Sequence, residues 1–448
     1  MKLTIIGAGG FRTPLLIKAL YKKFMDLGID KIVLYDIDRK RQNLVKDLIA
    51  YAVPSKTTSH NICVEYDAYE ALRGADFVIT TFRVGGMEGR IQDEKIPLRY
   101  GVLGQETTGP GGFSMALRSI PVMLGYLDIM REVCPDAWII NFANPSGLMT
   151  EAILKLGGWQ KVAGICDGPE SVRLFAAGML SVDEENVSLD YFGLNHLGWV
   201  RRVLVNGLDI LPAFISQLDP NSKFPGLPFS GRLVKSLGMI PNEYLYYYYY
   251  RMTAVDAILR ENQTRGEYLL EKNCKLDTDL QELRKGKQFS GMWETYWSYL
   301  DERNQTYMHY AKESPVQNTR EEAHLGYANV AYRVINGLTS GRVNALVNLP
   351  NEGAVTGMGD DDVVEIPVEI AHGVVTRKTV GSIPGHSLAL MQQVKQYERL
   401  VIEGVKTHSY STCLQALTIH PLVMDEVIAR KILDDYIQVF KNDYPALE

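Results

Sequence analysis

Residues 2–36 read KLTIIGAGGFRTPLLIKALYKKFMDLGIDKIVLYD, and this stretch decides the fold. A β-type run, Lys2–Ile6, leads into a glycine turn, and an amphipathic helical pattern follows over Thr13–Met25. A second β-type run, Lys31–Tyr35, ends at Asp36. Strand, tight turn, helix and strand in this order are typical of a parallel sheet with crossover helices. We therefore expect an α/β fold built on a doubly wound parallel sheet.

The glycine turn and Asp36 together predict a nicotinamide dinucleotide site. Glycines at a strand–helix junction let the backbone approach a pyrophosphate, and the helix N-terminus offers unpaired N–H groups. Asp36 lies about 26 residues further on, near the spacing at which an acid meets the adenosine ribose. The residues expected to hold the cofactor are Gly7, Gly9, Gly10, Phe11 and Asp36. A ligand-free tight turn is the alternative, because Arg12 replaces the usual third glycine, and nearby Arg39 and Lys40 leave NADP open.

The length and composition limit the domain organisation and the class of protein. A chain of 448 residues is too long for one compact core, so we expect a NAD-binding domain over residues 1–166 and a substrate-binding and oligomerisation domain over 167–448. A net charge of −6 argues against a nucleic-acid partner. No apolar run approaches the roughly 18 residues of a membrane span, and the N-terminus does not resemble a signal peptide. Five scattered cysteines fit reduced thiols in the cytoplasm.

A cysteine and a histidine stand out in the stretch from Lys161 to Val200. Cys166 directly follows the apolar run Val162–Ile165, and His196 comes thirty residues later. The carboxyl ends of strands hold ligands in open α/β sheets, and a thiolate and an imidazole there could share a metal. A cysteine in this position is more often a small buried hydrophobic residue. From these residues alone, both interpretations stay open.

Two further segments carry polar residues at expected strand or helix ends. The strand pattern Asp76–Phe82 is followed by Arg83 and Arg90, which suit a loop over an anionic or polyol ligand or, alternatively, a solvated basic loop. The glycine-rich run 100–112 cannot form an ordinary helix or strand. We expect it to present Glu106 at the N-terminus of the following helix.

The remaining chain contains weaker signals. Ala137–Phe142 reads as a strand, and Ser146 is expected to cap the next helix. Tyrosines fill six of the seven positions from 244 to 250, and most are expected to pack, although one pointing into a site could act as a base. Val343–Leu349 and Val363–Ile370 are predicted to form a second, mostly antiparallel sheet.

Six motifs in a fixed order resemble a known family. They are GAGG with Asp36, FRVGGMEGR, YGVLGQETTGPGG, NFANPSG, GICDGP and YFGLNHLGW. This series closely resembles glycoside hydrolase family 4, especially its 6-phospho-glucosidases, over essentially the whole chain. The resemblance implies a Rossmann-like domain akin to lactate and malate dehydrogenases, joined to an α+β substrate domain. It also implies NAD and Mn²⁺ as cofactors, in place of the paired carboxylates of most glycosidases.

The resemblance implies a mechanism that begins with oxidation. NAD⁺ takes a hydride from sugar C3, and the resulting ketone acidifies the C2–H bond. A base removes the C2 proton while the metal stabilises the enolate as a Lewis acid. The aglycone then leaves C1 by elimination, water adds and the hydride returns.

The same resemblance assigns roles to individual residues. Cys166 and His196 match the metal ligands, and Tyr244 matches the catalytic base, although a phenol with a pKa near 10 needs a nearby cation to act at neutral pH. Asp167 is the second catalytic candidate. The expected substrate contacts are Arg83, Arg90, Glu106, Asn144 and, for the 6-phosphate, Arg265.

The anomer is decided by few residues. Asp167 after Cys166 is typical of 6-phospho-α-glucosidases, which use it as a general acid, whereas the GQETTGPGGFS run with Thr108 favours the β members. We expect hydrolysis of 6-phospho-β-glucosides, either phosphorylated disaccharides such as cellobiose 6-phosphate or aryl glucosides. A 6-phospho-α-glucosidase is the alternative, and an NAD-dependent 2-hydroxy-acid dehydrogenase and an inactive sugar-phosphate sensor are further ones. The resemblance also implies a cytoplasmic homodimer or homotetramer.

Overall fold

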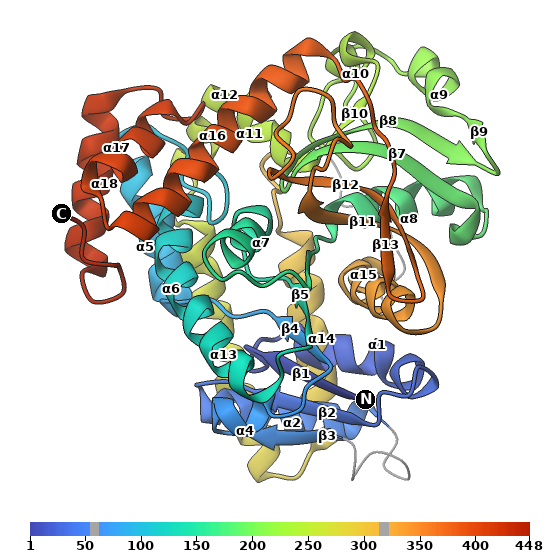
Figure 1. Ribbon diagram of the computed structural model, residues 1–448, viewed down its shortest axis with the longest axis vertical. Coiled ribbons are helices and arrows are strands. Elements are labelled where there is room, and N and C mark those ends of the chain that lie inside the picture. The colour runs from blue at the N-terminus through green and yellow to red at the C-terminus, as the bar shows by residue number, and fades with distance from the viewer. Residues whose placement is uncertain (54–61, 313–321) are drawn as a thin grey trace.

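A computed structural model describes residues 1–53, 62–312 and 322–448. Its parallel strands come from the first part of the chain (Figure 1). They are β1 (Lys2–Ile6), β2 (Lys31–Tyr35), β3 (Ile62–Glu65), β4 (Phe77–Thr80), β5 (Trp138–Asn141) and β6 (Val162–Gly164). Their order across the sheet is β3-β2-β1-β4-β5-β6, which is the strand order of dinucleotide-binding domains. The predicted fold class is therefore confirmed in this half.

The later strands extend the same sheet. They are β7 (Val187–Leu194), β8 (Leu197–Val205), β9 (Leu208–Asp209), β10 (Ile240–Pro241), β11 (Arg342–Pro350), β12 (Val363–Ala371) and β13 (Val374–Arg377). Antiparallel pairing of Asn348 in β11 with Gly164 in β6 joins them to the parallel half. The prediction of a second sheet was wrong, because β11 covers the edge that β6 would otherwise expose, with its unpaired N–H and C=O groups. The boundary between residues 166 and 167 stays a prediction.

Helices cover both faces of the parallel half. They are α1 (Thr13–Asp26), α2 (Arg39–Ala52), α4 (Ala68–Leu72), α5 (Gly86–Leu98), α6 (Pro110–Val133), α7 (Ser146–Lys155) and α8 (Gly168–Leu180). In α1 the buried residues Leu16, Leu20 and Phe24 recur every fourth position, so they form one face toward the sheet. The predicted Ser146 cap was wrong, because α7 begins at Ser146 itself and its hydroxyl donates to the carbonyl of Asn141 in β5 at 3.1 Å.

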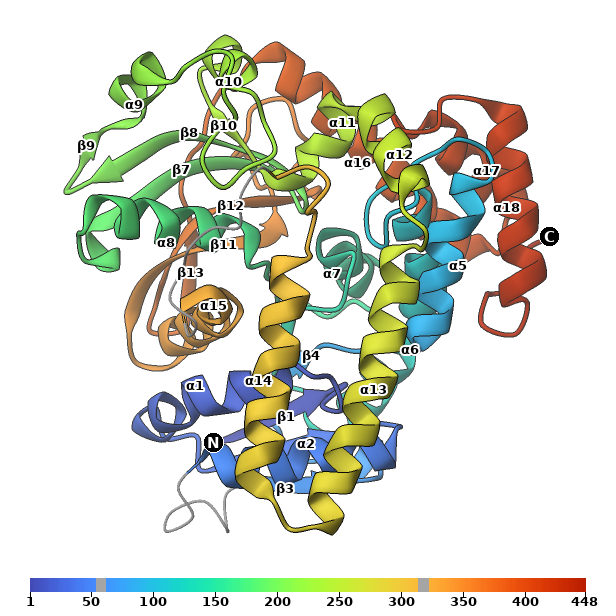
Figure 2. The ribbon, with the colours of Figure 1, turned by 180° about the vertical axis from the view of Figure 1, so that it is seen from behind.

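The second half adds helices that pack onto the first. They are α9 (Leu211–Gln217), α10 (Gly231–Leu237), α11 (Tyr246–Tyr249), α12 (Arg251–Arg260), α13 (Arg265–Lys285), α14 (Phe289–Gln305), α15 (Glu322–Thr339), α16 (Gly385–Thr407), α17 (Tyr410–Ile419) and α18 (Glu426–Phe440). Figure 2 shows the α13–α14 hairpin lying along the dinucleotide-binding half. Leu276, Leu280 and Tyr296 of this hairpin share a buried cluster with Leu44 and Leu48 of α2. Residues far beyond 167 are thus part of the packing around the cofactor half.

One described helix, α6, has the length and hydropathy of a membrane span by composition alone. Most of its apolar window, 61%, is buried inside the molecule. Phe113, Leu117, Ile120 and Leu127 belong to the main hydrophobic core. Its apolar character is therefore accounted for by packing within the protein.

Candidate active site

A cavity of about 830 Å³ lies where the two halves of the chain meet. One end carries polar residues from distant parts of the sequence: Arg12, Glu106, Asp167, Tyr244, Arg265 and Arg303. Four of them, Glu106, Asp167, Tyr244 and Arg265, were predicted as site residues, and a fifth predicted residue, Arg90, lines the cavity as well. The fold therefore brings these five together around one cavity, whereas the predicted residues Arg83, Cys166 and His196 are not among its lining residues.

The glycine turn lies beside Asp36, as the sequence predicted. Gly7 has a φ of +85°, and a side chain there would place its Cβ 2.6 Å from the backbone nitrogen of Phe82. The N–H of Gly9 donates to the Asp36 carboxylate at 2.8 Å, and a Cβ at Gly9 would lie 2.9 Å from that carboxylate. This close packing needs glycine at both positions and leaves the backbone bare at the start of α1, as a pyrophosphate site requires.

Phe11 has a different environment from the glycines. Its ring lies 5.3 Å from that of Tyr299, and its carbonyl accepts a 2.6 Å hydrogen bond from Tyr296 in α14. The side chain is 6% exposed. Phe11 therefore packs the glycine turn against the α13–α14 hairpin. Its contact with a cofactor stays a prediction.

The fold places Cys166 just after β6 and His196 in the turn between β7 and β8. Cys166 is the second residue after β6 and is 9% exposed. His196 is the second residue of the two-residue β7–β8 turn, where its φ of +63° is a costly conformation for a residue with a side chain. Asn195 in the same turn accepts a hydrogen bond from the Ser146 N–H at 3.0 Å, and burial and the Glu365 carboxylate raise the pKa of the Cys166 thiol well above its usual value.

The His196 ring is oriented by Thr107. Its Nδ1 lies 3.1 Å from the Thr107 hydroxyl, so Nε2 is the nitrogen that can hold a metal. Burial lowers the pKa of His196 to about 4, which keeps the imidazole neutral and able to bind a cation. The described residues contain no cluster of three or more His, Cys, Asp or Glu side chains suited to a metal. A thiol and an imidazole thus fit a metal that takes its remaining ligands from the substrate and water.

Tyr244 lies on top of the histidine. The two rings stack with centroids 3.8 Å apart and planes inclined by 6°, and the backbone N–H of Tyr244 donates to the Asn242 side chain at 3.0 Å. Burial and the Glu243 carboxylate raise the pKa of Tyr244 well above its usual value. The phenol therefore needs a neighbouring cation before it can act as a base.

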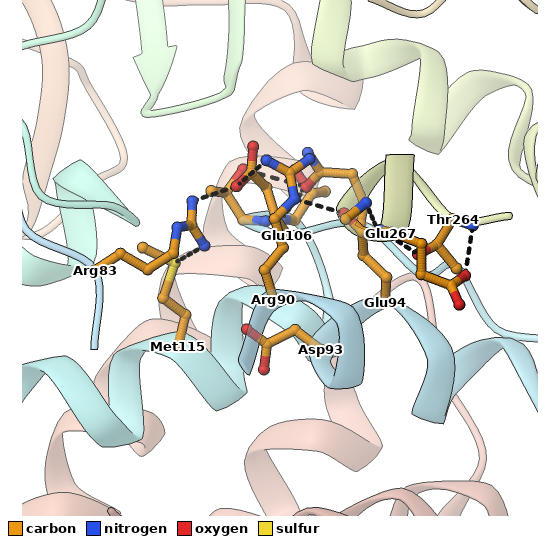
Figure 3. Close-up of polar contacts among 12 residues, drawn as sticks. Arg83, Arg90, Asp93, Glu94, Glu106, Met115, Thr264 and Glu267 are labelled. Carbon is orange, nitrogen blue, oxygen red and sulfur yellow. Dashed lines mark hydrogen bonds and ion pairs between the residues drawn. The ribbon is translucent and has the colours of Figure 1, made fainter. Parts of the chain in front are cut away.

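Glu106 is held by two arginines from the segment after β4 (Figure 3). Arg83 pairs with its carboxylate, and the Arg90 guanidinium contacts it at 2.9 Å while also donating to Glu94 at 2.8 Å. Burial opposes ionisation of Glu106, but Arg90 and Arg83 outweigh it and lower its pKa to about 2. The Arg90 side chain is 6% exposed, so the alternative of a solvated basic loop is wrong for it. Glu106 is a permanent anion that can accept sugar hydroxyls.

Arg265 lines the cavity at the first turn of α13. Its guanidinium donates to the Thr306 hydroxyl at 2.7 Å and the Arg303 carbonyl at 2.6 Å, while Nε has no partner among the described residues. Burial and the positive charges of Arg90 and Arg303 lower its pKa to about 10. These crowded cations provide an anion site, as a sugar phosphate needs. Asn144, half-buried after β5, does not line this cavity.

The structure adds residues that sequence patterns did not reveal. Arg12, noted only for replacing a glycine, pairs with Asp167 at 3.3 Å. Glu365 in β12 lies near Cys166, and accepts hydrogen bonds from Tyr191 at 2.6 Å and Asn348 at 3.2 Å. Burial raises the pKa of Glu365 to about 7. A carboxylate inside a hydrophobic strand pattern is the one signal that pointed to it.

Two family descriptions match successive parts of the chain. Residues 2–182 match the family described as Family 4 glycosyl hydrolase, and residues 191–423 match its C-terminal domain. A 6-phospho-β-glucosidase of Thermotoga maritima is 33% identical over 442 residues, covering 98% of each chain. A 6-phospho-α-glucosidase of Leptotrichia buccalis is 29% identical over 462 residues, covering 100% of this chain and 99% of the relative.

Solved structures show the same fold. The T. maritima 6-phospho-β-glucosidase with manganese, NAD⁺ and glucose-6-phosphate superposes with a TM-score of 0.84 at 30% identity, covering 100% of both chains. A lactate dehydrogenase of Eimeria maxima has a TM-score of 0.50 at 14% identity over 91% of this chain and 95% of its own, which concerns the fold alone. The predicted dehydrogenase-like architecture is therefore confirmed.

Proposed function

Because the chain belongs to glycoside hydrolase family 4, we propose that it is a 6-phospho-β-glucosidase that works by transient oxidation of the sugar. Its activity is NAD-dependent hydrolysis of a phosphorylated glucoside, and its cofactors are NAD and Mn²⁺, which the solved T. maritima relative contains. The observation that carries the proposal is the stack of Tyr244, which lines the cavity, on His196, with Cys166 close to the phenol.

Each of the proposed site residues has a separate role in the reaction. When bound, NAD⁺ accepts and returns a hydride and Mn²⁺ acts as a Lewis acid. Cys166 and His196 hold the metal, and the glycine turn with Asp36 holds the dinucleotide. Glu106 accepts a sugar hydroxyl, and Arg265 binds the 6-phosphate. Tyr244 removes the C2 proton from the oxidised sugar.

Asp167 is the residue on which the anomer depends. It lies at the cavity wall and its carboxylate pairs with Arg12 at 3.3 Å. In a 6-phospho-α-glucosidase the same carboxyl would protonate the leaving oxygen, so this activity is the second candidate. Relatives of both kinds cover nearly the whole chain. We favour the β anomer because the GQETTGPGGFS run matches the β members.

The test is turnover of p-nitrophenyl 6-phospho-β- and α-glucosides, side by side, with NAD⁺, Mn²⁺ and a reductant. We expect release of p-nitrophenol from the β anomer, loss of activity on chelation, and recovery with Mn²⁺. In D₂O the glucose 6-phosphate formed should carry deuterium at C2, because Tyr244 exchanges that proton. NADH accumulation on 2-hydroxy acids would favour a dehydrogenase. Binding of NAD and phosphosugar without turnover would favour a sensor.

We further propose that the protein is a cytoplasmic homodimer or homotetramer. The five cysteines are free thiols in the structure, which supports a reducing compartment. Exposed apolar residues on α18 and near it, among them Met424, Val427 and Val439, support an interface there. Sedimentation analysis of the purified protein measures the oligomeric state directly.

A further inference from the structure

The cavity continues well beyond the residues assigned to the sugar. Its volume of about 830 Å³ is in the range of sites that enclose a drug-sized ligand, larger than a single sugar phosphate requires. The part beyond Asp167 is bounded by α8, by α9 and by the loop that contains Phe224. We call this part the apolar arm.

One face of α8 forms the first wall of the apolar arm. Val172, Phe175, Ala176, Met179 and Leu180 line it, with the three- and four-residue spacing that places side chains on one helix face. The helix starts next to Asp167, and Met179 lies eleven positions after Gly168. At 1.5 Å per residue this wall extends roughly 16 Å from the reacting centre. Met179 is 50% exposed, so the arm ends at solvent.

The opposite wall is equally apolar. Leu211 and Phe214 of α9 and Phe224 and Leu227 of the loop face the cavity, and the rings of Phe214 and Phe224 meet at 5.4 Å and 64°. Among the described lining residues, those from β8, α9 and the loop have no charged or hydrogen-bonding side chain. The cationic side chains that line the cavity, such as Arg12, Arg265 and Lys312, come from other parts of the chain. The two ends of one cavity therefore differ in chemistry.

We propose that the apolar arm binds the aglycone and selects aryl and alkyl 6-phospho-glucosides over phosphorylated disaccharides. This inference rests on the proposed function and names its substrate class. A second sugar in the arm would exchange water for mainly apolar walls, on which Ser171 of α8 is the one hydroxyl among the described lining residues of α8, α9 and the Phe224 loop. An apolar aglycone gains instead by burial, and each methylene removed from water is worth about a two- to fourfold gain in binding.

The test is a series of methyl, butyl, hexyl and octyl glucoside 6-phosphates, in the anomer that the enzyme turns over. Their leaving alcohols have similar acidity, so differences in kcat/KM report binding of the chain. We expect kcat/KM to rise about two- to fourfold per methylene until the arm is full, with cellobiose 6-phosphate below the hexyl compound. A flat series, or a preference for cellobiose 6-phosphate, would overturn the inference. Failure of every compound, methyl included, would instead contradict the proposed function.

Two variants of residues in the apolar arm test whether the dependence on chain length arises there. Phe214→Ala should lower the octyl-to-methyl ratio of kcat/KM, whereas Phe289→Ala, an exposed phenylalanine of α14 outside the cavity, should leave that ratio unchanged. Met179→Glu should lower the ratio without changing the oligomeric state in sedimentation analysis. If it separates subunits and leaves the ratio intact, a second copy of the chain covers the arm and the inference is wrong.

Discussion

The ring of Tyr244 stacks on the imidazole of His196, with centroids 3.8 Å apart and planes 6° apart. This contact joins the proposed base to a proposed metal ligand, so a cation held by His196 would lie close to the phenol. Its position on the short 3-10 turn Glu243–Leu245 depends on the Asn242 side chain, which accepts the Tyr244 N–H. A substitution at Tyr244 can therefore affect both the proposed proton transfer and the proposed metal site.

Tyr244→Phe keeps the stack and removes the hydroxyl. We expect kcat on a 6-phospho-glucoside to fall about 10²- to 10⁴-fold, the usual contribution of a general base. Mn²⁺ binding, measured by electron paramagnetic resonance, should be unchanged. Tyr244→Ala should weaken Mn²⁺ binding as well, because it also removes the ring over His196. A Phe variant with nearly full activity would show that another group takes the proton.

Thr107→Val tests the orientation of the metal ligand. Because the Thr107 hydroxyl lies 3.1 Å from Nδ1 of His196, its loss should reduce Mn²⁺ affinity about 10- to 100-fold. Thr108→Val is the matched control, since the neighbouring buried hydroxyl has no partner among the described residues. Equal Mn²⁺ affinities in the two variants, by calorimetric titration, would contradict this role.

Glu106 predicts a specific dependence of stability on pH. Its pKa is lowered from 4.5 to about 2 in the folded chain, mainly by Arg90 and Arg83 against the effect of burial. A carboxyl whose pKa falls on folding stabilises the folded state fully above its unfolded pKa, and this contribution disappears as pH falls from 4.5 toward 2. The difference in unfolding free energy between wild type and Glu106→Gln should therefore be larger at pH 7 than at pH 3. The control is Glu88→Gln, an exposed change on α5, the helix that carries Arg90, where the same comparison should show a smaller effect.

Lys395 joins the C-terminal helices to the core. Its ammonium group contacts Glu151 of α7 at 2.7 Å and Glu398 at 2.5 Å, and it is 1% exposed. Lys395→Met leaves the buried Glu398 carboxylate without its lysine and leaves Glu151 with Lys155 alone, which should cost about 3–5 kcal/mol in urea unfolding. Lys406→Met removes an exposed lysine from the same helix and should change stability by less than about 0.5 kcal/mol. Similar losses in both variants would show that the pair is not the cause.

Much of the fold could be predicted because its signals are local. Residues 2–36 contain strand, glycine turn, helix and acid at fixed spacings, and the parallel half follows the dinucleotide-binding strand order. The position of Cys166 at a strand end was likewise readable, since an apolar run ends just before it. The sequence did not reveal the sheet to which β11 and β12 belong, because the residue pattern of a strand does not indicate which strand it pairs with.

The sequence by itself determined the fold class, the cofactor half and the family, because periodicity, glycine spacing and ordered motifs are properties of neighbouring residues. Only the tertiary structure decided which groups meet across the chain. Arg12 and Asp167 are 155 residues apart, and Tyr191 and Glu365 are 174 apart, yet both pairs are in contact. The apolar arm also depends on tertiary structure, because α8, α9 and the Phe224 loop line one cavity only when the folded sheet brings them together. Long-range packing sets such contacts, and no local pattern encodes them.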